Sequence, residues 1–91
     1  MEQEYVYVFM GENSIVPSGI YKTYNKANEW IEKNSLSGGL HKLPIDISLY
    51  DWATKQDYFT PKTESQSGPK FIQTFSCASV DHWHFEDGKE G

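Results

Sequence analysis

Tyr5-Val6-Tyr7-Val8-Phe9-Met10 is the stretch of sequence that decides the fold. Its residues are β-branched or aromatic up to Met10, a composition that favours a strand. An apolar run without polar alternation is typical of a strand that is buried on both faces or nearly so, and we therefore expect a central strand. Residues 11–14 have turn chemistry, and Ile20-Tyr21 follows Pro17. The simplest arrangement is an antiparallel return strand that carries Pro17 at its edge or start.

The clearest helix is predicted at residues 24–34. Ala27, Trp30 and Ile31 lie at helical spacing, and Tyr24 completes the apolar stripe. Thr23 suits the N-cap position. The glycines that follow, within residues 34–39, are available for a left-handed cap.

The remaining elements are shorter. Residues 40–47 include Pro44 and predict a strand near an edge. Ser48 to Asp51 matches a capping box with Asp in the last position, which predicts a helix from Leu49 to about Gln56. Residues 60–69 have the lowest hydrophobicity and predict a mobile surface loop.

Two elements close the chain. Phe71 to Phe75 fits either a helix or a strand, and Pro69 favours the helix slightly because proline suits a first helical turn. Residues 82–86 have a period-two pattern and predict a strand. The order of elements indicates one α+β domain over residues 1–91, with a small, mostly antiparallel sheet and helices packed on one face.

Composition excludes several classes of function. The chain has 91 residues, a formal charge of −5, and eight basic residues, all lysine. Nucleic-acid binding needs clustered positive charge and usually arginine, so we do not expect it. No apolar stretch approaches the length of about 20 residues that spans a membrane, and the acidic N-terminus does not resemble a signal peptide. Cys77 is the lone cysteine, which fits a reducing cytoplasmic setting.

No catalytic signature is present, and we expect no enzymatic activity. Cys77 lacks a neighbouring cation that would lower its thiol pKa, so it is expected to be a small buried apolar residue. Ser37-Gly38-Gly39 is too short for a phosphate loop and follows a helix rather than preceding one. Asp51 is explained by its place in a first helical turn.

The strand at residues 82–86 carries the one candidate metal site. If it alternates, Trp83 and Phe85 face the core, and His82, His84 and Glu86 share the opposite face as possible zinc ligands. Same-face neighbours on one strand are about 6.6–6.8 Å apart, so three in a row rarely close on one ion. His41 or Asp81 would have to supply a fourth ligand, and the simpler expectation is a solvated polar face without a cofactor.

Acidic residues point to a protein partner. They gather near residues 2–12 and again around the last predicted strand, and the two groups form one surface if those strands are neighbours. Candidate contact residues for a basic partner are Asp57, Tyr58, Asp81, Trp83, Glu86 and Asp87, with the two aromatic side chains as anchors. Plain solubility is the alternative explanation of the charge.

Several short motifs resemble a family of small bacterial domains of uncharacterised function. They are Val8-Phe9-Met10-Gly11-Glu12, Pro17-Ser18-Gly19-Ile20-Tyr21, Ala27 with Trp30-Ile31, Tyr50-Asp51-Trp52-Ala53, Phe59-Thr60-Pro61-Lys62 and His82-Trp83-His84-Phe85-Glu86-Asp87-Gly88. The resemblance covers nearly the whole chain and implies a bacterial, single-domain, non-secreted protein, with no activity to carry over. Size and acidity are also similar, more loosely, to immunity proteins that neutralise bacterial toxin domains.

These observations favour a non-enzymatic binding protein, and specifically an immunity protein that occludes the active site of a cognate, basic toxin domain. A metal- or small-ligand-binding domain on the His82, His84 and Glu86 face is the alternative. A regulatory or scaffold domain that binds through an exposed sheet edge is the third hypothesis.

Overall fold

Strand β1 (Tyr5–Gly11) lies between two other strands in the computed structural model, which describes residues 2–91. Its neighbours are β2 (Gly19–Tyr21) and β3 (Gly38–Pro44), followed by β4 (His82–Glu86) and β5 (Lys89–Glu90). The sheet order is β2-β1-β3-β4-β5, and every neighbouring pair is antiparallel. The predicted α+β class and the antiparallel sheet are therefore confirmed, with β2 as the edge strand that follows Pro17.

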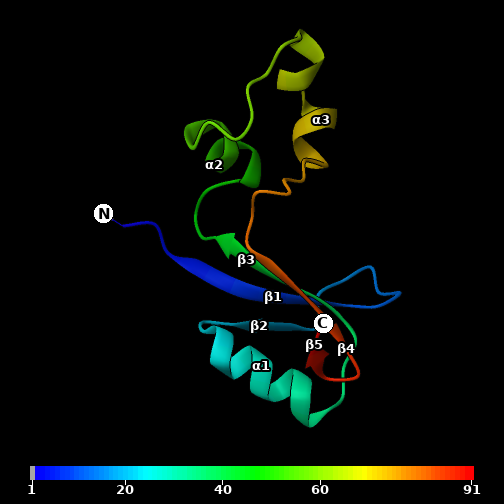
Figure 1. Ribbon diagram of the computed structural model, residues 1–91. Helices are drawn as coiled ribbons and strands as arrows, with labels where there is room; N and C mark the ends of the chain where they lie inside the picture. The colour runs from blue at the N-terminus through cyan, green and yellow to red at the C-terminus, as the bar shows by residue number, and fades with distance from the viewer. Residues whose placement is uncertain (1) are drawn as a thin grey trace.

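Helix α1 (Tyr24–Lys33) covers one face of this sheet (Figure 1). Its Ala27 and Ile31 are fully buried against Phe9, Leu40 and Phe85, each at most 1% exposed. Phe9 is the one buried residue of β1, and Val6, Val8 and Met10, which alternate with it, are only half-buried. The expected position of this strand inside the sheet is confirmed, but its burial is complete only at Phe9. The middle of the opposite face has no covering helix in residues 2–91.

The start of α1 was predicted correctly, but the residue that ends it was not. The Thr23 hydroxyl accepts a hydrogen bond from the Lys26 N–H at 3.2 Å, as expected of an N-cap. At the other end the left-handed residue is Ser35, with φ 54°, and not a glycine. The Leu36 N–H donates to the Ile31 carbonyl at 3.0 Å, which closes a Schellman motif. Gly38 is needed elsewhere, because a Cβ there would collide with the Met10 carbonyl.

Residues 47–80, here named the helical unit, lie beyond the end of the sheet, away from α1 (Figure 1). They contain α2 (Leu49–Lys55), the 3₁₀ helix η1 (Glu64–Ser67) and α3 (Pro69–Gln73). Their buried side chains are Tyr50, Trp52, Ala53 and Val80. We name the remainder, the five strands with α1, the sheet unit. Among residues 2–91, no helix combines the length and apolar character needed to cross a membrane.

Local signals explain the helical unit. The Ser48 hydroxyl accepts from the Asp51 N–H at 3.0 Å, so the predicted capping interaction is present. Pro69 occupies the first turn of α3, which confirms the helix favoured there. Part of the predicted loop at residues 60–69 is η1 instead. The Tyr50 hydroxyl holds that turn by donating to the Gln66 carbonyl at 2.8 Å.

A short hairpin joins β4 to β5. Asp87 and Gly88 have φ values of 50° and 85°, as a two-residue turn of the I′ type requires. The Asp-Gly pair was a hairpin signal that the prediction did not use, so β5 was missed. Tyr24 anchors β5 by donating its hydroxyl proton to Glu90 at 2.5 Å. Burial, together with the hydrogen bond and charge of Glu90, raises the pKa of Tyr24 to about 12.

Candidate functional site

The predicted partner-binding residues do not form one surface. β3 separates β1 from β4, so the condition for merging the two acidic groups is not met. The strands run so that Asp81 lies beside Lys42, at the end of the sheet nearest the helical unit. Glu86 is the last residue of β4 and Asp87 follows it in the turn, so both lie at the far end of that strand. The Asp87 N–H there donates to the Ser37 hydroxyl at 3.0 Å.

Trp83 belongs to neither end. It points to the α1 face as predicted, where its ring lies 5.8 Å from Tyr7 and 5.0 Å from Tyr24, between ring centroids. It is half-buried and packs on the core of the sheet unit. Its contribution to a partner surface is therefore limited by its role in holding α1 to the sheet.

Asp57 and Tyr58 are positioned by the end of α2. Asp57 takes the left-handed conformation, with φ 62°. The Tyr58 N–H then donates to the Ala53 carbonyl at 2.9 Å and the Asp57 N–H to the Thr54 carbonyl at 3.2 Å, the two bonds of a Schellman motif. This turn lays the Tyr58 ring against Trp52, with centroids 5.4 Å apart. Tyr58 is nevertheless 53% exposed, so a rigid backbone presents a large aromatic side chain to solvent.

Three surface hollows meet at Tyr58. One, of about 450 Å³, is lined by aromatic residues and the 74–79 segment. The second, of about 470 Å³, has Asp57 and Lys62 on its walls. The third, of about 200 Å³, lies over Lys42 and Asp81. We name Asp57, Tyr58, Phe59, Ser79 and Asp81 the Tyr58 surface.

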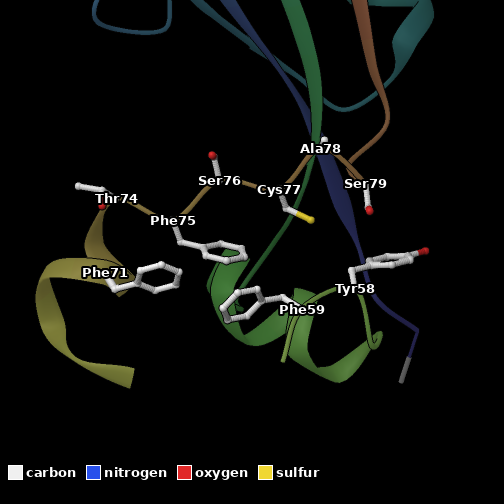
Figure 2. Close-up of a pocket in the computed structure, with 9 residues that line it drawn as sticks. All are labelled: Tyr58, Phe59, Phe71, Thr74, Phe75, Ser76, Cys77, Ala78 and Ser79. Carbon is white, nitrogen blue, oxygen red and sulfur yellow. The ribbon is translucent and has the colours of Figure 1, made fainter. Parts of the chain in front are cut away.

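The first hollow is the most apolar of these three (Figure 2). Phe59, Phe71 and Phe75 gather on one side of it, with ring centroids 5.1–5.9 Å apart. Tyr58 lies on the other side, and the Cys77 thiol points between Phe75 and Tyr58 in this view. Cys77 is partly buried and packs beside Trp52, Ala53 and Val80, as expected of a small apolar residue.

Charges around the Tyr58 surface are mixed. The second and third hollows, with an adjacent one at the N-terminal end of β1, are lined by five carboxylates and three lysines: Glu2, Glu4, Asp46, Asp57 and Asp81, and Lys42, Lys55 and Lys62. Lys42 also lies 4.6 Å above the centre of the Tyr5 ring. The surface is thus mildly acidic, and its exposed aromatic side chains distinguish it more than its charge does.

The candidate metal ligands lie where alternation predicted. His82, His84 and Glu86 are exposed on the face opposite α1, while Phe85 is buried. Within residues 2–91 no group of three or more His, Cys, Asp or Glu side chains is arranged to hold a metal ion. The directly opposed partner of His82 is His41 on β3. Burial, and secondarily the charge of His82, lowers the pKa of His41.

Sequence comparison places the chain in a family. A family model described as a domain of unknown function (DUF7710) matches residues 6–91. The chain belongs to the DUF7710 family. No curated protein and no solved structure shows significant similarity to it. The expected membership in an uncharacterised family is confirmed, while the quoted motifs and the likeness to immunity proteins stay predictions.

The DUF7710 match includes both units and every residue of the Tyr58 surface. Sequence reasoning had named Asp57, Tyr58 and Asp81, which the fold brings to one end of the molecule. It missed Phe59 and Ser79, and it did not place Phe71 and Phe75 at the same hollow. The available signal was the density of phenylalanine on both sides of the hydrophilic segment at 60–69, which predicts that the ends of that segment pack together.

Proposed function

We propose that this chain is a non-enzymatic protein-binding domain that recognises its partner through the Tyr58 surface. The observation that carries the proposal is the position of Tyr58, more than half exposed at the junction of three hollows. Tyrosine is enriched at binding hot spots because its ring buries a large area at low cost in side-chain entropy. The Schellman motif and the Trp52 ring fix its backbone and one face, so little order would be lost on binding.

The partner we propose is basic and supplies an apolar or aromatic side chain to the hollow beside Phe59. The carboxylates of Asp57 and Asp81 flank Tyr58 and attract cationic groups, which would steer association more than they strengthen it. The most specific form of the proposal is an immunity protein. In that form, the Tyr58 surface covers the active-site cleft of a toxin domain, and carboxylates occupy positions of its anionic substrate.

The test is co-expression with the product of a neighbouring toxin gene, followed by calorimetry on the purified pair. Tyr58→Ala is expected to weaken binding by at least about 2 kcal/mol, or about 30-fold, as loss of a hot spot does. Ile20→Ala is the matched control, because Ile20 is 66% exposed but lies on edge strand β2, away from the helical unit. Asp81→Asn should mainly slow association and reduce its dependence on salt.

Two outcomes contradict the proposal. In the first, Tyr58→Ala binds the partner as tightly as wild type while Ile20→Ala binds it more weakly. This result would place the binding site on the open sheet face and support the scaffold hypothesis. Failure of the chain to bind or inhibit the product of any neighbouring toxin gene would rule out the immunity form.

A further inference from the structure

All three histidines of the chain lie on the sheet face that α1 does not cover. His41 on β3 and His82 on β4 are directly opposed, and His84 follows on the same face of β4. The Lys42 N–H bonds to the Asp81 carbonyl at 3.0 Å, so the adjacent pair, His41 and His82, is a non-hydrogen-bonded pair. Side chains approach most closely at such pairs. The sheet therefore holds two imidazoles side by side.

The tautomer of His82 is set by its own chain. Its Nδ1 lies 2.8 Å from the Val80 carbonyl oxygen. Because a carbonyl oxygen can only accept, Nδ1 carries the proton and Nε2 presents a free lone pair. A hydrogen bond from one ring nitrogen to a backbone carbonyl is the usual support for a histidine that ligates metal through its other nitrogen.

The two rings also lie close to each other. Their centroids are 5.9 Å apart and their planes differ by 20°, so the rings are stacked. Rotation about the side-chain torsions would bring one nitrogen of each ring to about 2.0–2.1 Å from a shared ion. Gly39 gives the His41 ring its room, because a Cβ at Gly39 would lie 3.0 Å from the His41 Cε1 atom.

A hollow of about 320 Å³ adjoins the pair. Both histidines line it, and Leu43, Leu49 and Val80 supply apolar walls. An ion held by the imidazoles would thus have space for water ligands on one side. This hollow shares Ser76, Cys77 and Ala78 with the first hollow, but it includes no residue of the Tyr58 surface, so the two proposals rest on different residues.

We propose that His41 and His82 form a two-histidine chelate for a late first-row divalent ion, Zn²⁺ or Cu²⁺, with water completing the coordination shell. Imidazole nitrogen prefers these ions, whereas Mg²⁺ and Ca²⁺ prefer oxygen ligands. The ligands come from two neighbouring strands, so binding also fastens β3 to β4. This replaces the ligand set His82, His84 and Glu86, which lie in sequence along one strand.

The test is titration of the tag-free chain with ZnCl₂ and with CuCl₂ by calorimetry, and by thermal unfolding with and without metal. Wild type is expected to bind one ion per chain, with a higher Tm in the metal. His82→Ala should weaken binding by about tenfold or more, because loss of even a supporting group costs 10–100-fold in metal affinity. His82 is exposed, so this variant keeps the core intact. His41→Ala should match it.

His84→Ala is the control, since it removes an exposed imidazole two residues away on the same face of the same strand. It should bind within about twofold of wild type. The proposal is overturned if His82→Ala retains wild-type affinity, if His84→Ala loses as much as His82→Ala, or if wild type binds neither ion. None of these results changes the expectation for Tyr58→Ala, so the two proposals fail separately.

Discussion

The sheet unit and the helical unit both contain many aromatic residues but are packed to different depths. In the sheet unit, the core between α1 and the sheet contains Phe9, Ile31, Leu40 and Phe85, each at most 1% exposed. In the helical unit, Ala53 is the one residue with no exposure, and α3 has no buried residue. One unit therefore has a closed core, and the other has an open aromatic cluster.

The two units differ in burial because they differ in the surface that is available to cover their apolar side chains. A sheet face presents many side chains at once, and one amphipathic helix of three turns is enough to close it. Three short helices have no such face, so their aromatic rings cover one another, with centroids 5.1–6.2 Å apart. The cluster consists of Tyr50, Phe59, Phe71 and Phe75, and its contacts include edge-to-face, tilted and stacked pairs. The open cluster leaves the hollow beside Tyr58. Stability is therefore concentrated in the sheet unit and the candidate binding surface in the helical unit.

Phe9→Ala is expected to have the largest effect. A fully buried phenylalanine replaced by alanine costs about 3–5 kcal/mol, a large share of the stability of a small domain. Urea denaturation followed by tryptophan fluorescence measures the loss. Val8→Ala is the control, since Val8 lies on the next position of β1 but on the open face. A loss at Phe9 no larger than that at Val8 would contradict a core confined to the α1 face.

Phe71→Ala should cost less, about 1.5–2.5 kcal/mol, because Phe71 is only half-buried and a fully buried ring is worth about twice that. Its neighbour on α3, Ile72, is 37% exposed, and Ile72→Ala should be near neutral. Hydrogen exchange is the sharper measurement. Faster exchange in residues 49–75, with β1 and β3 unchanged, is expected. Equal acceleration in both units would show that they unfold together.

Sequence predicted the sheet unit better than the helical unit for the same reason. α1 and β4 each carry a periodic pattern that depends on one neighbouring surface, and β1 is marked by its β-branched and aromatic composition. Thr23 marks the start of α1 by a local hydrogen bond. The coverage of β1 was overestimated, because an apolar run does not say whether a second helix exists to cover the other face. η1 was missed because its support comes from Tyr50, 16 residues away from Gln66.

The candidate site shows a similar limit. Composition and charge named Asp57, Tyr58 and Asp81, but the sheet order decided which of the named residues meet. Inserting β3 between β1 and β4 depends on long-range pairing that no local signal encodes. The His41–His82 pairing has the same origin. The sequence could suggest His41 as an added ligand, but only the register makes it the partner of His82.

Acidification should act on the sheet unit and spare the helical unit, which contains no histidine. The pKa of His41 is lowered in the folded chain, chiefly by burial and then by the charge of His82. Below the unfolded pKa of about 6.5, the unfolded chain therefore binds more protons than the folded chain, which favours unfolding. The contribution of neutral His41 to the free energy of unfolding is present above that pH and is lost as the pH falls below it. The urea concentration at the midpoint of unfolding should therefore decrease as the pH is lowered from 7.5 to 5.5.

His41→Gln is the variant that checks this source, since it should flatten the pH dependence. His82→Ala should flatten it only in part, because burial of His41 remains. His84 is the other histidine on that face. If His84→Ala alone abolished the pH dependence, the effect would come from His84 and the prediction for His41 would be wrong. Hydrogen exchange at pH 5.5 should locate the loss in β3 and β4.

Asp57→Gly is expected to have the smallest effect on stability, and a favourable one. Asp57 holds a left-handed conformation that glycine adopts without strain, while glycine loses more backbone entropy on folding, so the net gain is about 0.5 kcal/mol. The same change removes one carboxylate beside Tyr58 and leaves the Schellman motif in place, since both of its hydrogen bonds are made by backbone groups. A chain that is slightly more stable and associates more slowly with a basic partner would show that Asp57 serves recognition as well as the turn. Unchanged association would show that the turn alone explains this residue, and that the contrast between a stable sheet unit and a binding helical unit rests on Tyr58 and its aromatic neighbours.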